Sequence, residues 1–183
     1  MRKVLSQSFF NRPTLTVARE LLGKFLVRRL GRNAIAIMIT EVEAYDGPYD
    51  KASHASRGVT PRTKIMFGEA GYFYVYFTYG MHWMLNVVTG PKGYPAAVLV
   101  RAGTLAGTSD KGHATRIING PARLTKYLRI GKSFNGKSAT KKTGLWLEDR
   151  GKKIRAKDIT AGKRVGVEYA GEWAEKPYNF KMG

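Results

Sequence analysis

The chain has 183 residues, of which 43% are hydrophobic and 11% aromatic, so it can bury a core and is not expected to be disordered. Its 32 Lys and Arg residues against 13 Asp and Glu residues give a formal net charge of +19, which indicates a polyanionic partner: DNA, RNA or an acidic membrane surface. The absence of cysteine excludes disulfides and thiolate metal sites.

Neither a targeting segment nor a cofactor is expected. No run approaches the roughly 20 apolar residues of a membrane span, and the N-terminus lacks the apolar core of a signal peptide. The histidines, His54, His82 and His113, are not spaced as metal ligands. We therefore expect a cytoplasmic protein with no metal or other cofactor, built as a single domain over residues 1–183.

In chain order, the first predicted elements are a helix and a meander of strands. Apolar residues recur at helical spacing over Val17–Leu22, and Thr14 or Thr16 is expected to cap this helix. Phe25–Leu30 predicts a strand, and Ala34–Tyr45 predicts its hairpin partner.

The stretch that follows, TEVEAYDGPYDKASH, concentrates four of the thirteen acidic residues: Glu41, Glu43, Asp46 and Asp50. Carboxylates on so basic a surface repel phosphates, so their clustering marks a candidate site. If no bulge interrupts the strand, period-2 alternation places six of its residues on one face: Ile35, Ile37, Ile39, Glu41, Glu43 and Tyr45. A partly buried carboxyl group at the end of an apolar face suits proton transfer. The alternative is that Glu41 and Glu43 are solvated residues at a strand end.

Two aromatic-rich arms over Tyr72–Val88 predict a hairpin, with Gly80 supplying the special backbone angles of its turn. Phe73, Val75 and Phe77 are expected to fill a sheet core. Tyr79 lies at the tip, where there is no core to fill. An exposed aromatic ring amid positive charge can stack on bases or wedge between them.

The second half of the chain predicts shorter elements. Ala96–Ala102 is an apolar strand interrupted by Arg101, a residue that is costly to bury unless it is paired or points into a site. Asp50–Lys64 is expected to be a surface loop, or a short helix followed by a loop. The remaining predictions are a loop over Thr104–Ala114, a helix over Ala122–Leu128, strands over Trp146–Asp149 and Arg164–Tyr169, and a tail from Gly171.

Several motifs agree in residues, order and spacing with one known family. VEAYDGPYDKASH is followed by TPRTKIMF, YVYFTYGMHWMLNV, VLVRA, INGPARL and VGVEYAGEWAEKP. From about Ser8 to Pro177 the chain resembles the 3-methyladenine (alkyladenine, or N-methylpurine) DNA glycosylase family, as a compact bacterial-type member. The resemblance implies an α+β fold: a single mixed domain with a curved antiparallel β-sheet, flanking helices and a protruding β-hairpin that enters the DNA minor groove.

The family's activity, carried over by resemblance, is base excision in DNA repair. Its members flip alkylated or deaminated purines out of the duplex, a class that includes 3-methyladenine, 7-methylguanine, hypoxanthine and ethenoadenine. They then hydrolyse the N-glycosidic bond with an activated water and leave an abasic site. Double-stranded DNA with damaged purines is the implied partner, and a monomer is expected, whereas repair partners stay unknown.

The resemblance also implies roles for individual residues. Catalysis falls to Glu43, as the general base, and to Arg101, which helps hold the water and the adjacent phosphate. Base binding falls to Tyr45, His54 and Tyr76, which stack on the flipped purine, and to Asn86, which crowds the exocyclic amine of guanine.

The same resemblance places Tyr79 in the gap left by the flipped nucleotide, with Met81 beside it in the minor groove. The backbone carbonyl of Val165 is a possible third ligand of the water, with plain strand packing as the alternative. The tail after Pro177 departs from the family pattern, which leaves the C-terminal contacts open.

Two other classes of function also fit parts of the sequence. A non-catalytic protein that senses damaged DNA would keep the basic surface but would have no need of Glu43 facing phosphate. An RNA-binding protein would explain the charge but not Glu43, Tyr79 and Arg101 together.

Overall fold

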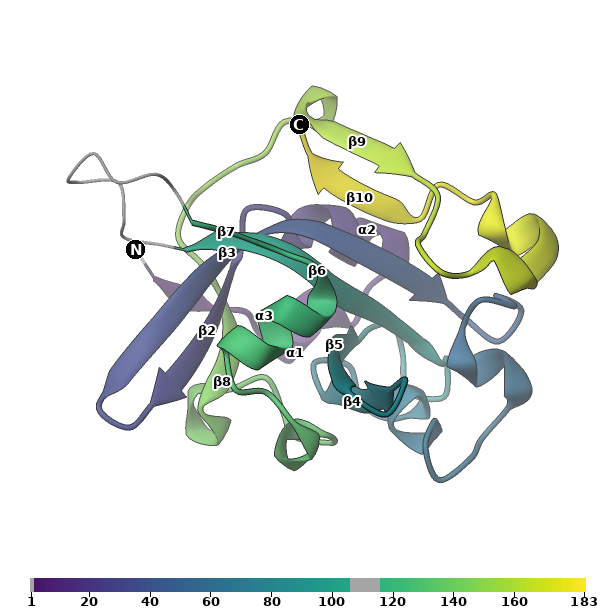
Figure 1. The fold of residues 1–183 in the computed structure, drawn as a ribbon, viewed down its shortest axis with the longest axis horizontal. Coiled ribbons are helices and arrows are strands. Elements are labelled where there is room, and N and C mark those ends of the chain that lie inside the picture. The colour runs from purple at the N-terminus through teal and green to yellow at the C-terminus, as the bar shows by residue number, and fades with distance from the viewer. Residues whose placement is uncertain (1, 106–115) are drawn as a thin grey trace.

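A long strand, β3 (Asn33–Asp46), is the centre of the antiparallel sheet in the computed structural model, which describes residues 2–105 and 116–183 (Figure 1). The first part of β3 pairs with β2 (Phe25–Leu30) and its later part pairs with β10 (Asn179–Met182). On its other side β3 pairs with β6 (Ala96–Leu105) from Ile37 to Asp46. The carboxylate-bearing end of β3 is therefore enclosed by strands on both sides.

The strand order along the main path of the sheet is β1-β8-β2-β3-β6-β5-β4, with β10, β9 and β7 attached beside it. The remaining strands are β1 (Lys3–Val4), β4 (Phe73–Thr78), β5 (His82–Val88), β7 (Ile117–Asn119), β8 (Leu145–Asp149) and β9 (Ile159–Gly162). The α-helices are α1 (Gln7–Phe10), α2 (Thr14–Leu21) and α3 (Pro121–Tyr127). Short 3₁₀ turns are η1 (His54–Arg57), η2 (Lys64–Phe67), η4 (Lys132–Phe134), η5 (Lys141–Thr143), η6 (Ala156–Asp158) and η7 (Glu168–Ala174).

The helices pack on the sheet through apolar residues. In Figure 1, α2 lies behind β3 and α3 lies in front of β6. One core joins the buried apolar residues of the helices to those of the strands. The helices contribute Val17, Ala18 and Leu21 from α2, Leu124 from α3, and Leu128 just after α3. The described residues thus form one α+β domain, and none of their helices is long and apolar enough to cross a bilayer.

Most predicted elements are confirmed, with shifted ends. The expected helix begins earlier, at Thr14, and neither Thr14 nor Thr16 caps it, because Pro13 holds the cap position. The hydroxyl of Thr14 instead accepts a hydrogen bond from Thr89, at 3.2 Å. The expected loop from Thr104 begins with the last two residues of β6, and its other residues lie outside the described ones, as does His113.

The strand predicted over Arg164–Tyr169 is wrong. These residues lead into η7, and the strands of this region are β9 before it and β10 in the tail. The alternation of apolar residues had predicted a strand here, but the backbone groups of these residues do not pair with a neighbouring strand. The N–H of Val165, for example, donates to the carboxylate of Glu43 rather than to a neighbouring strand.

A β-bulge interrupts β3 where the alternation rule expected a continuous face. The register with β6 shifts between Ile39 and Glu41, and again between Glu41 and Val42. Ile37 and Ile39 lie in the core before this irregularity, whereas Val42 and Ala44 lie in it afterwards. Glu43 therefore points to the face opposite Ile37 and Ile39, because an extra residue reverses the parity of a strand. The expectation of one shared face is wrong.

Candidate active site

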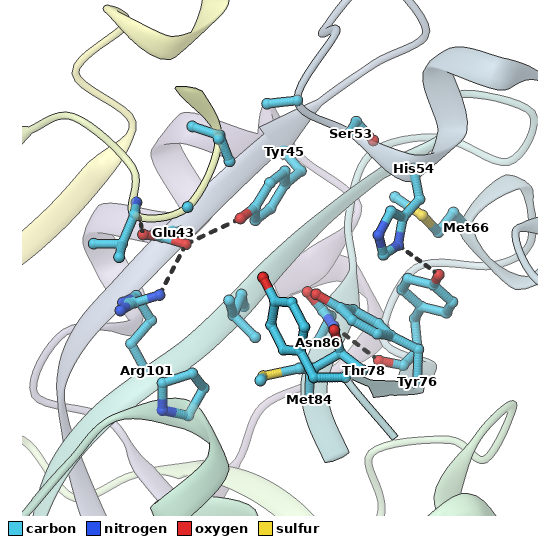
Figure 2. Close-up of a pocket in the computed structure, with 18 of the residues that line it drawn as sticks. Glu43, Tyr45, Ser53, His54, Met66, Tyr76, Thr78, Met84, Asn86 and Arg101 are labelled. Carbon is cyan, nitrogen blue, oxygen red and sulfur yellow. Dashed lines mark hydrogen bonds and ion pairs between the residues drawn. The ribbon is translucent and has the colours of Figure 1, made fainter. Parts of the chain in front are cut away.

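A cavity of about 290 Å³ opens on the face of the sheet that the bulge gives to Glu43 (Figure 2). Its walls come from β3, β4, β5 and β6 and from the segments around His54 and Val165. The predicted site residues that line it are Glu43, Tyr45, His54, Tyr76, Tyr79, Asn86, Arg101 and Val165. Met81, the remaining one, is not among the lining residues and lies on the exposed side of the hairpin turn.

Glu43 is fully buried and its carboxylate is surrounded by donors. Oε1 accepts hydrogen bonds from the backbone N–H of Val165 at 2.8 Å and from Nδ2 of Asn179 at 3.1 Å. Oε2 accepts from the hydroxyl of Tyr45 at 3.0 Å and lies 3.2 Å from Nη1 of Arg101. Figure 2 shows Tyr45 and Arg101 reaching this group from different sides. A buried carboxylate without such partners would be strongly disfavoured.

Arg101 lies at the irregular part of β6 and joins Glu43 to a second acid. Its Nε donates to Oε1 of Glu41 at 2.9 Å. Burial alone would raise the pKa of Glu41, but the hydrogen bond from Asn179 and the charges of Arg101 and Lys181 outweigh it and lower that pKa. Both carboxylates thus have cationic and neutral donors beside them, and the arginine is paired as the sequence required.

Tyr45 contributes both its ring and its hydroxyl to the cavity. Burial, and then the neighbouring Glu43, raise the pKa of the Tyr45 phenol well above its usual value. The phenol therefore stays protonated and donates to Glu43. The guanidinium of Arg164 lies 4.9 Å from the centre of the Tyr45 ring, which fixes the ring from outside the cavity.

His54, Tyr74 and Tyr76 form the aromatic wall of the cavity. Nδ1 of His54 lies 2.9 Å from the hydroxyl of Tyr74, and its ring meets that of Tyr76 edge to face at 4.6 Å. Burial, followed by the charges of Arg62 and Arg57, lowers the pKa of His54 to about 4. The imidazole is therefore uncharged near neutral pH and presents an aromatic surface without a positive charge.

Asn86 is buried between the aromatic wall and the middle of the sheet. Its Nδ2 donates to the carbonyl of Tyr74, at 3.1 Å, across the β4–β5 pair. Because this bond uses the amide nitrogen, the side chain is held in one orientation at the edge of the cavity. A rigid amide at the edge of the cavity can sterically exclude a ligand group that does not fit beside it.

The turn between β4 and β5 holds Tyr79 and Gly80 in left-handed backbone conformations, with φ of 50° and 65°. Two such residues suit a tight hairpin turn, which the N–H of Met81 closes by donating to the carbonyl of Thr78 at 3.1 Å. The sequence predicted this conformation for Gly80 alone. For a tyrosine it costs about 1–2 kcal/mol. Tyr79 is 81% exposed and Met81 is 66% exposed, so packing of these side chains offsets little of that cost in the free protein.

The sequence did not predict the residues that support the site from behind. Arg164 and Asp50 form an ion pair with fully buried side chains. Arg164 also donates to the carbonyls of Ala44 and Trp173, and so ties the acidic loop to the segment that carries Val165. Asp50 stood in the acidic cluster, but its partner is 114 residues away. No pattern in the sequence marked Asn179, in the tail, as part of the site.

Among residues 2–105 and 116–183, no group of three or more His, Asp and Glu side chains gathers as metal ligands do. What the cavity offers chemically is a buried carboxylate beside an arginine, an aromatic wall whose histidine is uncharged near neutral pH, and an exposed tyrosine at its mouth. This combination suits acid–base chemistry on a planar ligand.

Comparison with known proteins identifies the family of this chain. The model of the methylpurine-DNA glycosylase family matches residues 8–183. The chain belongs to this family. The match includes the tail after Pro177, where the resemblance read from the motifs had ended.

Relatives of this methylpurine-DNA glycosylase family member carry a consistent name, "Putative 3-methyladenine DNA glycosylase". The one from Methanocella arvoryzae is 46% identical over 97% of this chain and 91% of its own length. The one from Myxococcus xanthus is 44% identical over 95% of this chain and 87% of its own length. The one from Streptomyces avermitilis is 40% identical over 98% of this chain and 87% of its own length.

Proposed function

We propose that this chain is a monofunctional DNA glycosylase, acting as one domain over residues 1–183, that flips alkylated or deaminated purines out of duplex DNA and hydrolyses their N-glycosidic bond. The observation that carries the proposal is the fully buried Glu43 carboxylate, paired with Arg101 at one end of an aromatic cavity. A basic protein that only held DNA would have no use for a carboxylate there.

Glu43 acts as the general base in this proposal. A water bound at Oε2 attacks C1′ of the sugar, its proton passes to Glu43, and the purine leaves with the electrons of the broken N-glycosidic bond. Because three hydrogen bonds and the ion pair with Arg101 already occupy the carboxylate, the water has to replace one of these contacts. The longest of these contacts is the one to Arg101, at 3.2 Å, so the arginine is the group that makes room for the water and then binds it.

The aromatic wall favours purines that already carry a positive charge. Tyr45, Tyr76 and the uncharged His54 offer ring surfaces to a flipped base, and one good cation–π contact contributes about 0.5–2 kcal/mol. A protonated imidazole would repel such a base. His54, with a pKa of about 4, is also a poor proton donor at pH 7. Neutral lesions such as hypoxanthine, which leave more easily when protonated, should therefore react more slowly than alkylated adenine.

The β4–β5 hairpin is the proposed wedge. Tyr79 and Met81 are exposed at its turn, and Tyr79 also borders the cavity. A ring inserted into the base stack can hold the space that a flipped nucleotide leaves, which repays the strained backbone of Tyr79 only in the complex.

The proposal is tested by incubating the protein with duplexes that contain one alkylated adenine, one hypoxanthine or no lesion, and cleaving the products with alkali. We expect abasic sites in both damaged duplexes, with the alkylated adenine released faster, and none in the undamaged duplex. Binding without strand cleavage would instead identify a damage sensor. Equal competition by RNA for the same surface would point to an RNA-binding protein.

A further inference from the structure

The C-terminal strand places an amide between the two acids of the site. Asn179, the first residue of β10, lies directly opposite Glu43 in the antiparallel pair and is 2% exposed. Its Nδ2 donates to Oε1 of Glu41 at 2.9 Å and to Oε1 of Glu43 at 3.1 Å. One amide nitrogen carries two hydrogens, so a single neutral group serves both carboxylates.

Asn179 and Arg101 hold different oxygens of Glu43. Arg101 approaches Oε2, the oxygen that also accepts from Tyr45, whereas Asn179 and the N–H of Val165 take Oε1. With Oε1 fixed by two donors, rotation of the carboxylate is prevented. Only Oε2 is then left to exchange a donor for a water.

The orientation of the Asn179 amide supports this reading. Its Oδ1 is buried and has no hydrogen-bond partner among the described residues. An unsatisfied buried acceptor costs about 1–3 kcal/mol. The opposite orientation would place that oxygen against two carboxylate oxygens, which repel it. The carboxylates therefore dictate how the amide is turned, even though its own acceptor stays unpaired.

We propose that Asn179 is a positioning residue for the glycosylase reaction: its amide locks Oε1 of Glu43 to Glu41 and so keeps Oε2 directed at the attacking water. The inference rests on the proposed function, because a protein that does not break the N-glycosidic bond has no base to position. It assigns a catalytic purpose to the C-terminal tail, which the sequence left open.

The test compares the wild type with Asn179→Leu, which keeps the approximate shape of the side chain but removes both donors. Asn179→Ala is the second variant, in case the first does not fold. Thr160→Ala is the matched control, because Thr160 lies on β9 beside β10 and touches neither acid. Thermal unfolding first establishes that each variant is folded.

Two measurements follow, one of which needs no activity. In ¹³C NMR titrations, removal of the Asn179 donor should raise the pKa of Glu41 relative to the wild type. In single-turnover excision of alkylated adenine at pH 7, we expect the rate to fall about 10- to 100-fold with unchanged affinity for the lesion duplex.

Thr160→Ala should behave as the wild type in both measurements. A folded Asn179 variant that cuts at the wild-type rate would overturn the inference and leave the proposed function standing. A wild-type protein that releases no base would overturn the proposed function, and the positioning role with it.

Discussion

The charge state of His54 follows from its surroundings. Its ring is packed against Tyr76 and hydrogen-bonded to Tyr74, and burial, followed by the charges of Arg62 and Arg57, lowers its pKa from 6.5 to about 4. In the unfolded chain the imidazole binds its proton near pH 6.5, whereas in the folded protein it does so only near pH 4. The unfolded state therefore holds more protons between these values, and stability must fall as the pH falls through this window.

The matching experiment compares His54→Gln with the wild type by urea unfolding at a series of pH values from 7 to 4. The wild type should lose more unfolding free energy than the variant between about pH 6.5 and 4. Parallel curves for the two proteins would show that His54 is not held in its neutral form.

At the scale of elements, the buried pair of Arg164 and Asp50 connects the acidic loop after β3 to the segment before η7. Arg164→Met should lower the unfolding free energy by about 3–5 kcal/mol, because it leaves a buried carboxylate unpaired. The double variant Asp50→Leu with Arg164→Met should regain only part of that loss. No charge is then left unpaired, but the carbonyls of Ala44 and Trp173 still lack the donor that Arg164 provided.

The pair of Arg155 and Asp158 is the matched control on the surface, where its arginine is 70% exposed. Arg155→Met should change stability by less than about 1 kcal/mol in the same urea titration. If Arg164→Met proved as mild as Arg155→Met, the buried pair would not be what holds the two segments together.

The β4–β5 hairpin makes a separate prediction. Tyr79→Ser should weaken binding to a lesion duplex by about tenfold or more, because stacking of one aromatic ring on a base contributes about 1–3 kcal/mol. Binding to the same lesion in a single strand should change little, since no base stack has to be opened. An equal loss on both substrates, measured by fluorescence anisotropy, would argue against a wedge.

These elements also show what the sequence could and could not predict. The β4–β5 hairpin and the β2–β3 meander could be predicted from local features of the sequence, namely Gly80 at the turn and runs of β-prone residues. The bulge that turns Glu43 toward the cavity depends on the register between β3 and β6. The alternation of residues within β3 alone does not reveal this register. The false strand over Arg164–Tyr169 has the same origin, because its groups bind partners far away in the chain.

The candidate site was predicted unevenly for a related reason. The resemblance named eight of the residues that line the cavity, since their motifs are contiguous in the sequence. The resemblance did not predict the contact of Asn179 with Glu43 or the pairing of Arg164 with Asp50. These contacts form only when the tail and two loops meet in the folded protein. Supporting contacts of this kind are set by tertiary packing rather than by local pattern.

On the scale of the whole molecule, the chain combines a net charge of +19 with a site that concentrates carboxylates. A positive surface attracts the DNA backbone, and that attraction weakens as the salt concentration rises, because the counterions that binding releases from the phosphates then gain less free energy. The negative charge of Glu43 opposes this attraction, so in the proposed mechanism Glu43 contributes to bond cleavage and not to DNA binding. Binding and bond cleavage should therefore separate when its charge is removed.

Single-turnover excision from a duplex with one alkylated adenine, run with wild type and Glu43→Gln side by side, tests this most directly. The proposed mechanism predicts that the variant binds the duplex at least as tightly as the wild type while its excision rate falls by about 10²- to 10⁴-fold. Excision by Glu43→Gln at close to the wild-type rate would contradict the account, because another group would then have to activate the water.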